Sequence, residues 1–157
     1  MALLSLPSQN RISDLLLKMN LRLDRFLTAQ KEGTCSTALE EIHNGRKESH
    51  WMWFIFPQLV GLGNSSIAKT YALEDLQEAI DYLAHPILGP RLIECTRAVW
   101  ERPEPITEIF GHPDHLKFRS CMTLFAQVSE AGSLFHIALH EKCNNAPDAM
   151  TLQLLNA

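Results

Sequence analysis

The chain has 157 residues, of which 46% are hydrophobic, so it fits one domain with a core of its own. It carries 14 basic and 18 acidic side chains, which gives a net charge of −4 with histidine neutral. This balance argues against duplex nucleic acid as a partner, because phosphate-driven binding needs a basic surface. The apolar run from Trp51 to Phe56 is far shorter than the roughly 20 residues that cross a bilayer, so we expect no membrane partner.

The N-terminal residues and the spacing of the cysteines indicate in which cellular compartment the protein resides. Residues 1–7 have a short apolar patch without a basic segment, which does not resemble a secretory signal. The cysteines are far apart and form no Cys-x-x-Cys pair; they are Cys35, Cys95, Cys121 and Cys143. We therefore expect a cytoplasmic protein with reduced thiols and no cofactor, rather than a disulfide framework or a zinc site. The sequence does not predict an oligomeric state.

The N-terminal part is expected to be a loose arm over residues 1–11. Apolar residues then recur at helical spacing from Ile12 to Leu27, and Asn20 is a candidate break between two helices. We accordingly divide the chain into residues 1–22, an arm and first helix, and residues 23–157, a single helical domain.

The rest of the chain alternates helical periodicity with capping and breaking residues. The expected segments are 34–43, a short helix within 51–56, 66–71, 74–84, 90–100, 106–110, 115–128, one around 134–139, and a last one opening at Pro147 and Asp148. In the segment 74–84, Leu76, Ala79, Ile80 and Leu83 are expected to face the core. No stretch alternates with period two, so we predict one compact all-α domain of roughly seven to nine helices, several of them short.

The stretch from Gly45 to Gly63 is the most unusual part of the sequence. It reads Gly-Arg-Lys-Glu-Ser-His-Trp-Met-Trp-Phe-Ile-Phe-Pro-Gln-Leu-Val-Gly-Leu-Gly. Aromatic faces beside cations suit a planar or anionic small molecule, through stacking and charge-assisted hydrogen bonds. The alternative is a buried aromatic hinge whose cations reach the solvent. In either case we expect Trp53 and Phe56 to lie mostly in the core.

A second candidate segment opens the helix at 115–128. Asp114, Lys117, Ser120 or Cys121, and Thr123 or Leu124 lie about one turn apart, so several of them project from one face. If this face meets the aromatic stretch, Asp114 and Lys117 could transfer a proton or bind a ribose and phosphate. The structural alternative is a capping aspartate beside a solvated lysine.

Other candidates carry less specific signals. Arg91 near a helix start could bind a phosphate, with His85 nearby, or could simply pair with a neighbouring carboxylate. His136 and His140 have a metal-binding spacing but no third ligand, so no metal site is predicted. Cys121 is expected to be a small core residue, because no thiol-enzyme motif surrounds it.

Five segments together resemble the domain-of-unknown-function 1810 family, which is sometimes labelled calpastatin. They are the stretch Gly45–Gly63, LDRFLTAQ from Leu23, YALEDLQEAIDYLAHPILGPRL from Tyr71, FGHPDHLKFRSCMTLF from Phe110 and DAMTLQLL from Asp148. The resemblance implies a mainly α-helical single domain and no established activity. The chain departs from the usual family pattern at Cys121, where a serine is usual, and lacks the glycine usual before the last helix. A fainter likeness connects the chain to NADAR-type ADP-ribose glycosidases.

These observations give two functional hypotheses. The first is a polar-lined aromatic pocket for a nucleotide- or ADP-ribose-like molecule, with N-glycoside hydrolysis as its chemistry. The second is a non-catalytic domain that receives a partner peptide on the same aromatic stretch. For the pocket, the expected catalytic residues are Asp114, Lys117 and His50. The expected ligand-binding residues are Arg46, Lys47, Trp51, Trp53, Gln58, Tyr71, His85, Arg91, Ser120 and Thr123.

Overall fold

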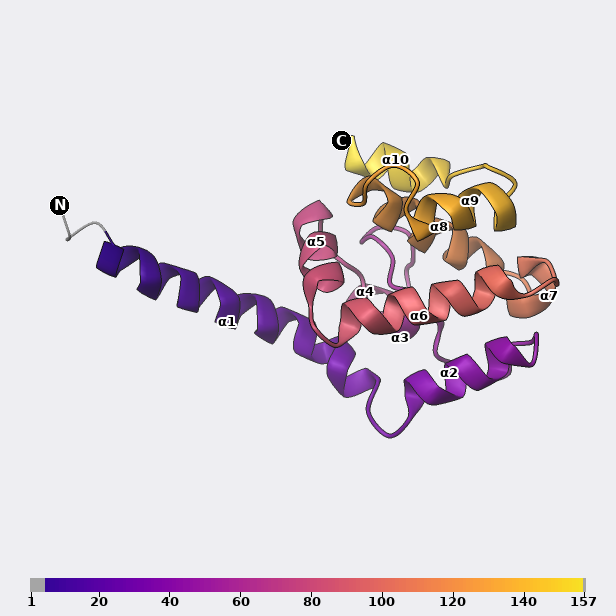
Figure 1. Ribbon diagram of the computed structural model, residues 1–157, viewed down its shortest axis with the longest axis horizontal. Helices are drawn as coiled ribbons and strands as arrows, with labels where there is room; N and C mark the ends of the chain where they lie inside the picture. Colours follow the sequence, from indigo (N-terminus) through magenta and orange to yellow (C-terminus); the bar gives the residue numbers. More distant parts are fainter. Residues whose placement is uncertain (1–4, 157) are drawn as a thin grey trace.

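The computed structural model describes the backbone of residues 5–156, and the side chains of this range except residues 5–10, 19 and 20. Over this range the chain is an all-α domain, as predicted (Figure 1). Its helices are α1 Ser5–Ala29, α2 Thr34–His43, α3 Met52–Ile55, α4 Ser66–Thr70, α5 Leu76–Ala84, α6 Leu88–Glu101, α7 Ile106–Phe110, α8 Asp114–Gln127, α9 Leu134–Lys142 and α10 Ala149–Leu155. In the described part, backbone pairing of the β type is limited to one isolated bridge, between Leu59 and Leu73.

Helix α1 differs from the expectation for the N-terminal part. It begins at Ser5 and continues through Asn20, so the loose arm is wrong for residues 5–11 and the break at Asn20 is wrong. Residues 1–4 of the expected arm lie outside the described residues. An asparagine inside a helix costs only about 0.7 kcal/mol relative to alanine, which is too little to stop a well-patterned helix. The first part of α1 extends away from the rest of the molecule (Figure 1).

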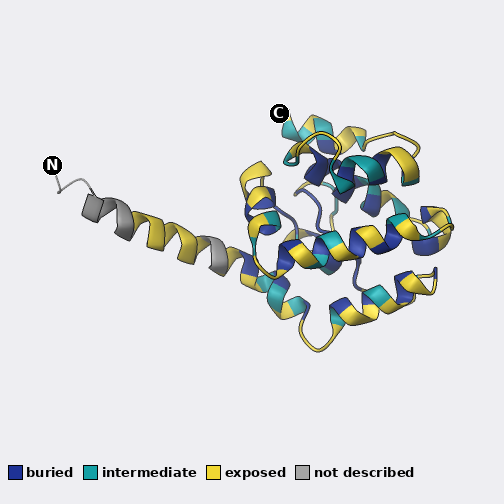
Figure 2. Ribbon diagram, viewed as in Figure 1, coloured by how far each residue is buried: buried dark blue, intermediate teal, exposed yellow. Residues whose placement is uncertain are grey.

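Helices α6 and α8 form the centre of the folded body. Helix α6 packs against α2, α5 and α9, while α8 packs against α5, α7, α9 and α10. Their inner faces are fully buried, with Leu92 and Val99 from α6 and Phe118 and Phe125 from α8 (Figure 2). The burial of this contiguous core stabilises the fold, because each large apolar side chain contributes about 1.5–3 kcal/mol when it leaves water.

Helix α5 is rotated relative to the expectation from periodicity. Ala79 is buried and Leu83 is half-buried, as predicted, but Leu76 and Ile80 are exposed. The prediction that Leu76 and Ile80 face the core is therefore wrong. A buried glutamate, Glu78, takes part of the inner face instead.

An ion pair explains this rotation. Glu78 Oε1 lies 2.7 Å from an Nη of Arg25 on α1, and the same guanidinium donates to the carbonyl oxygen of Ala72 at 2.8 Å. A buried carboxylate without such a partner would be costly, so the pair fixes which face of α5 meets α1. Tyr82, one turn after Glu78, then enters the core and packs edge-on against Phe26.

Helices α5 and α6 meet closely at a glycine. A Cβ added at Gly89 would lie 2.1 Å from the carbonyl oxygen of Leu83, so any other residue would push the two helices apart. Helix α6 begins at Leu88, two residues before the predicted segment 90–100. The segment 106–110 forms a helix with the predicted bounds, and Ser65 and Asp148 cap α4 and α10 as their residue types suggest.

Candidate functional site

The stretch Gly45–Gly63 folds as a short helix followed by extended chain. Helix α3 has only four residues, and Phe56 has φ −120° and ψ 75° because the following Pro57 disfavours helical backbone. Leu73 donates its N–H to the carbonyl oxygen of Gln58 at 2.8 Å and accepts from the N–H of Val60 at 2.8 Å. The stretch is therefore fixed to the segment before α5 at its C-terminal end.

A buried carboxylate from α2 fixes the other end. Glu41 accepts hydrogen bonds from the backbone N–H groups of Glu48 (2.6 Å) and Ser49 (2.8 Å), from Ser49 Oγ (2.5 Å) and from Trp51 Nε1 (3.0 Å). Burial would raise the pKa of Glu41, but the hydrogen bonds from Ser49, Glu48 and Trp51 outweigh it and lower the pKa to about 2. The sequence carries no signal for this role of Glu41, since a glutamate on a helix is usually a surface residue.

The two tryptophans of the stretch have different environments. Trp51 is only 2% exposed, and its ring lies 6.2 Å from Phe56 and 6.3 Å from Phe110 between centroids. Trp53 is half-buried, and a Cβ added at Gly63 would lie 3.0 Å from its ring. Phe56 is fully buried as expected, whereas the expectation that Trp53 lies mostly in the core is wrong. The reason is that Glu41 draws Trp51 inward, which leaves Trp53 at the surface of α3.

Trp53 lines an open cleft of about 220 Å³ between α3, the start of α4 and the start of α8. The residues around it are Lys47, His50, Trp51, Met52, Trp53, Phe54, Ser65, Ile67, Asp114 and Lys117. The cleft therefore combines the aromatic stretch with the polar start of α8, as the first hypothesis requires.

Three charged groups form the polar wall of the cleft. Asp114 Oδ2 lies 2.8 Å from Lys47 Nζ, and Asp114 Oδ1 lies 3.0 Å from Lys117 Nζ. Each ammonium also faces an indole, with Lys47 Nζ 5.3 Å from the ring centroid of Trp51 and Lys117 Nζ 5.3 Å from that of Trp53. These distances are within the range of cation–π attraction.

Asp114 opens α8 but does not cap it. It is the first residue of the helix after Pro113, and its carboxylate binds the two lysines instead of a backbone N–H. Burial would raise the pKa of Asp114, but the hydrogen bonds and charges of Lys47 and Lys117 hold it below its ordinary value. Asp114 is thus ionised at neutral pH, and the positive end of the helix dipole favours the same state.

Six of the predicted site residues meet at this cleft: Asp114, Lys117, His50, Lys47, Trp51 and Trp53. Arg46 is exposed and borders a neighbouring hollow next to Gly111. Tyr71 is half-buried and packs edge-on against Phe54, with 4.7 Å between ring centroids, so it supports a residue of the cleft from behind.

The other predicted residues have partners elsewhere. His85 Nδ1 accepts the N–H groups of Ile87 and Leu88 at the start of α6, and burial lowers the pKa of His85. An Nη of Arg91 donates to Gln30 Oε1 at 3.1 Å, which replaces the carboxylate partner considered for it.

Ser120 and Thr123 lie further along α8, inside the body. Ser120 Oγ donates to the carbonyl oxygen of Leu116, and Thr123 Oγ1 donates to that of Arg119 and accepts the N–H of Asp148. Gln58 is 2% exposed and does not line the cleft.

Four residues of the cleft were not predicted: Met52, Phe54, Ser65 and Ile67. Met52 and Phe54 belong to the aromatic stretch and could have been included with it. Ser65 was considered only as a helix cap, and Ile67 carries no sequence signal beyond being an apolar residue that the fold leaves exposed.

The candidate metal ligands and the cysteines lie outside the cleft. Among the described residues, no three His, Cys, Asp or Glu side chains are grouped in a way that could hold a metal ion. His136 Nδ1 lies 2.8 Å from Ser133 Oγ, and His140 is exposed. The four cysteines are free and buried, Cys121 among them. In the described part of the chain, no helix has both the length and the apolar character needed to cross a membrane.

Comparisons with known proteins identify relatives over most of the chain. A family model described as "Protein of unknown function (DUF1810)" matches residues 20–155. The crystal structure of the conserved hypothetical protein Rv1873 from Mycobacterium tuberculosis is similar, with 46% sequence identity and a TM-score of 0.82 over 86% of this chain and 96% of that chain. A search of curated proteins gives no match. The likeness to NADAR-type glycosidases has no support in these comparisons.

Proposed function

The chain belongs to the DUF1810 family, and from the cleft at its aromatic stretch we propose that it binds a small anionic ligand that carries a flat ring, such as a nucleotide or part of an ADP-ribose molecule. The observation that carries this proposal is the pair of lysines that share one carboxylate while each faces an indole. Flat aromatic surfaces stack on bases, and ammonium groups donate charge-assisted hydrogen bonds to phosphate or carboxylate.

The charges of the cleft favour an anion. Lys47 and Lys117 supply two positive charges against the single negative charge of Asp114, and the exposed His50 stands at the edge. The side chain of Lys47 is 9% exposed and that of Lys117 is 28% exposed. An ammonium has three N–H donors, so Lys117 can turn one toward a ligand while Lys47 keeps Asp114 in place. Lys117 is therefore the expected anion-binding residue.

The size of the cleft restricts the ligand. A volume of about 220 Å³ is below the roughly 300–1,000 Å³ of pockets that enclose drug-sized ligands. It suits one ring with one phosphate or carboxylate, and any further part of a dinucleotide would lie outside on the surface. The half-buried Trp53 provides the face on which the ring would stack.

N-glycoside hydrolysis has less support than binding alone. A general base works best when its pKa is close to the working pH, and the two lysines lower the pKa of Asp114 instead. The same carboxylate is already engaged on both oxygens. We therefore propose Asp114 as the residue that positions the lysines rather than as a base that activates water.

The rival hypothesis, a peptide-binding surface on the aromatic stretch, is less well supported. A partner peptide needs a broad exposed apolar surface. Trp51, Met52, Ile55 and Phe56 are buried, and Phe54 is half-buried against Tyr71. The stretch thus offers one half-buried indole at the cleft rather than an extended surface.

Calorimetric titration of the full chain with AMP, ADP-ribose and inorganic phosphate tests the proposal. We expect binding by at least one of them, and Lys117→Ala should weaken it by about tenfold or more, because a hydrogen bond to a charged group contributes about 1.5–3 kcal/mol. The melting temperature of Lys117→Ala should stay nearly unchanged, since a partly exposed ion pair contributes about 1 kcal/mol at most. His50→Ala should also leave the melting temperature unchanged and weaken binding to a smaller extent.

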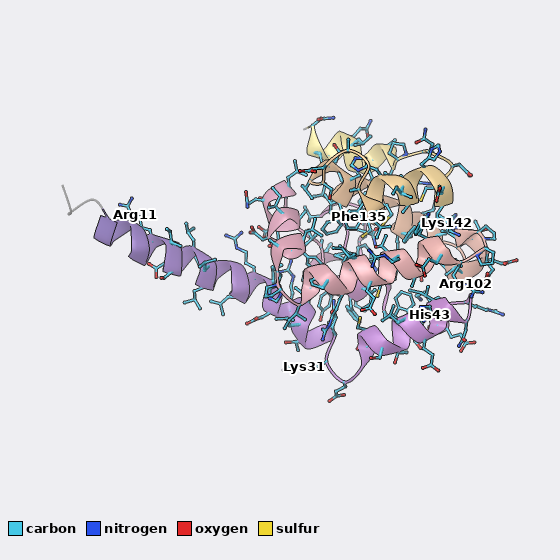
Figure 3. All side chains as sticks on the ribbon, in the orientation of Figure 1. Arg11, Lys31, His43, Arg102, Phe135 and Lys142 are labelled. Carbon is cyan, nitrogen blue, oxygen red and sulfur yellow. The ribbon has the colours of Figure 1, made fainter. Side chains whose placement is uncertain are left out.

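Lys31→Ala is the matched control, because Lys31 is an exposed lysine in the loop between α1 and α2 (Figure 3) and does not line the cleft. It should alter neither the affinity nor the melting temperature. Absence of binding by all three compounds at millimolar concentration would count against the proposal. An equal affinity of the wild type and Lys117→Ala for a compound that does bind would move its site away from this cleft.

A further inference from the structure

The projecting part of α1 carries an apolar stripe that no other part of the described chain covers. Ile12, Leu15 and Leu16 are exposed, although their helical spacing puts them on the same face as Leu23 and Phe26, which the body buries (Figure 2). One face of a single helix is thus part of the core at its C-terminal end and open to solvent further out. We call the residues Ile12, Leu15 and Leu16 the α1 stripe.

Such a stripe indicates a binding partner. Helices in water are marginal on their own, and most of their stability in proteins comes from packing of an apolar face. Large exposed apolar patches typically mark interaction surfaces. The α1 stripe also precedes residue 20, where the match to the family domain begins, so it adds a surface to that domain.

A second uncovered apolar surface lies on the body. Val60, Leu76 and Leu154 line a groove of about 490 Å³ between the segment before α4, the first turn of α5 and the end of α10. Val60 and Leu76 are exposed, and so is Ile80, one turn beyond Leu76 on α5. We call this surface the α5–α10 groove. It includes the side of α5 that periodicity assigned to the core.

Charge distinguishes between the partners available to the α1 stripe. Residues 1–22 contain the three basic residues Arg11, Lys18 and Arg22 and one acidic residue, Asp14, so their net charge is +2. Because the whole chain has a net charge of −4, residues 23–157 carry a net charge of −6. Arg11 stands on the projecting part of α1, away from the body (Figure 3). Two α1 helices side by side would bring like charges together, which disfavours that pairing.

The α5–α10 groove has the opposite charge. Glu74 and Asp75 lie among its lining residues, both exposed. A basic helix with an apolar stripe therefore complements a groove with an apolar floor and acidic residues at its edge. The remaining long helices of the body have their apolar faces buried in the core, so they do not compete for the groove.

We propose that two copies of the chain associate reciprocally, with the α1 stripe of each copy in the α5–α10 groove of the other. The interface is isologous, so a two-fold axis relates two equivalent contacts and closes the dimer. Each contact covers leucine and isoleucine side chains that the single chain leaves in water, and the ion pairs at the edge set the direction of the helix in the groove.

Sedimentation equilibrium of the full chain tests this proposal. The wild type should be a dimer, and Leu16→Glu should weaken the dimer by about tenfold or more, because the substitution removes one buried leucine and adds a charge. Leu17→Glu is the matched control. Leu17 is 58% exposed against 52% for Leu16, but it points to the opposite side of α1, so this variant should remain a dimer.

Complementation tests the reciprocal geometry. Leu76→Glu, in the groove, should weaken the dimer as Leu16→Glu does. A mixture of the two variants should form a heterodimer more readily than either variant dimerises alone, because one intact stripe then meets one intact groove. If the groove variant loses its helical circular dichroism, the comparison of Leu16→Glu with Leu17→Glu still decides. A monomeric wild type overturns the proposal. If that monomer binds phosphatidylserine vesicles, the α1 stripe meets a membrane surface instead of a second copy. A dimer that Leu16→Glu leaves intact, or folded variants that fail to complement, also overturn it.

Discussion

Replacing Glu41 with glutamine is expected to lower the free energy of unfolding by about 2–3 kcal/mol at pH 7. Glu41 is 8% exposed and accepts four hydrogen bonds, which hold the start of the aromatic stretch against α2. A glutamine of the same shape has one acceptor oxygen, and its NH₂ group would face N–H and O–H donors. Urea unfolding of the two proteins, followed by circular dichroism, measures the difference.

The same substitution should remove part of the acid sensitivity of the fold. The pKa of Glu41 is about 2 in the folded chain and ordinarily 4.5, so the folded state favours the ionised form. The resulting stabilisation is fully present above about pH 4.5 and is lost as the pH falls toward 2. The difference in unfolding free energy between wild type and Glu41→Gln should therefore shrink over this range, and a constant difference would contradict it.

Glu40→Gln provides the control for both experiments. Glu40 is the adjacent residue of α2 and is exposed, so its side chain loses little when its charge is removed. It should unfold within about 0.5 kcal/mol of the wild type at pH 7 and follow the pH dependence of the wild type. An equal loss of stability in the two variants would show that the helix, rather than the hydrogen bonds of Glu41, responds to the charge.

Much of the fold could be predicted because its signals are local. Serine and aspartate caps, proline and glycine breaks and helical periodicity place α4, α7 and α10 close to their observed bounds, since each signal acts within one or two turns. The contact between the aromatic stretch and the start of α8 entered only as a condition, because periodicity does not show which segment meets the polar face of a helix.

The rest depended on partners that are distant in sequence. The rotation of α5 follows from Arg25 and Glu78, which are 53 residues apart, and neither the spacing of Leu76 and Ile80 nor any cap carries that information. The roles of the two tryptophans likewise follow from Glu41, which lies on another helix. Periodicity identifies an apolar side of a helix, but it does not show whether the same chain, a second copy or water meets that side.

Trp51→Ala and Trp53→Ala are expected to destabilise the fold to different extents, although the two residues are only two positions apart at the start of α3. Trp51→Ala should lower the free energy of unfolding by about 3–5 kcal/mol, because it removes a fully buried indole between Phe56 and Phe110. It also leaves Glu41 without one of its donors. Trp53→Ala should cost about 1–2 kcal/mol, because part of its ring is already in water.

For the anionic ligand of the cleft the order should be reversed. Trp53→Ala should weaken binding about tenfold or more, since stacking of a base on an aromatic ring contributes about 1–3 kcal/mol, and Trp53→Phe should recover most of the affinity. Chemical unfolding and calorimetric titration on the same preparations give both quantities. A large stability loss in Trp53→Ala with unchanged affinity would make Trp53 a core residue. The cleft would then lack the surface on which a ring can stack, because Trp51 faces the interior.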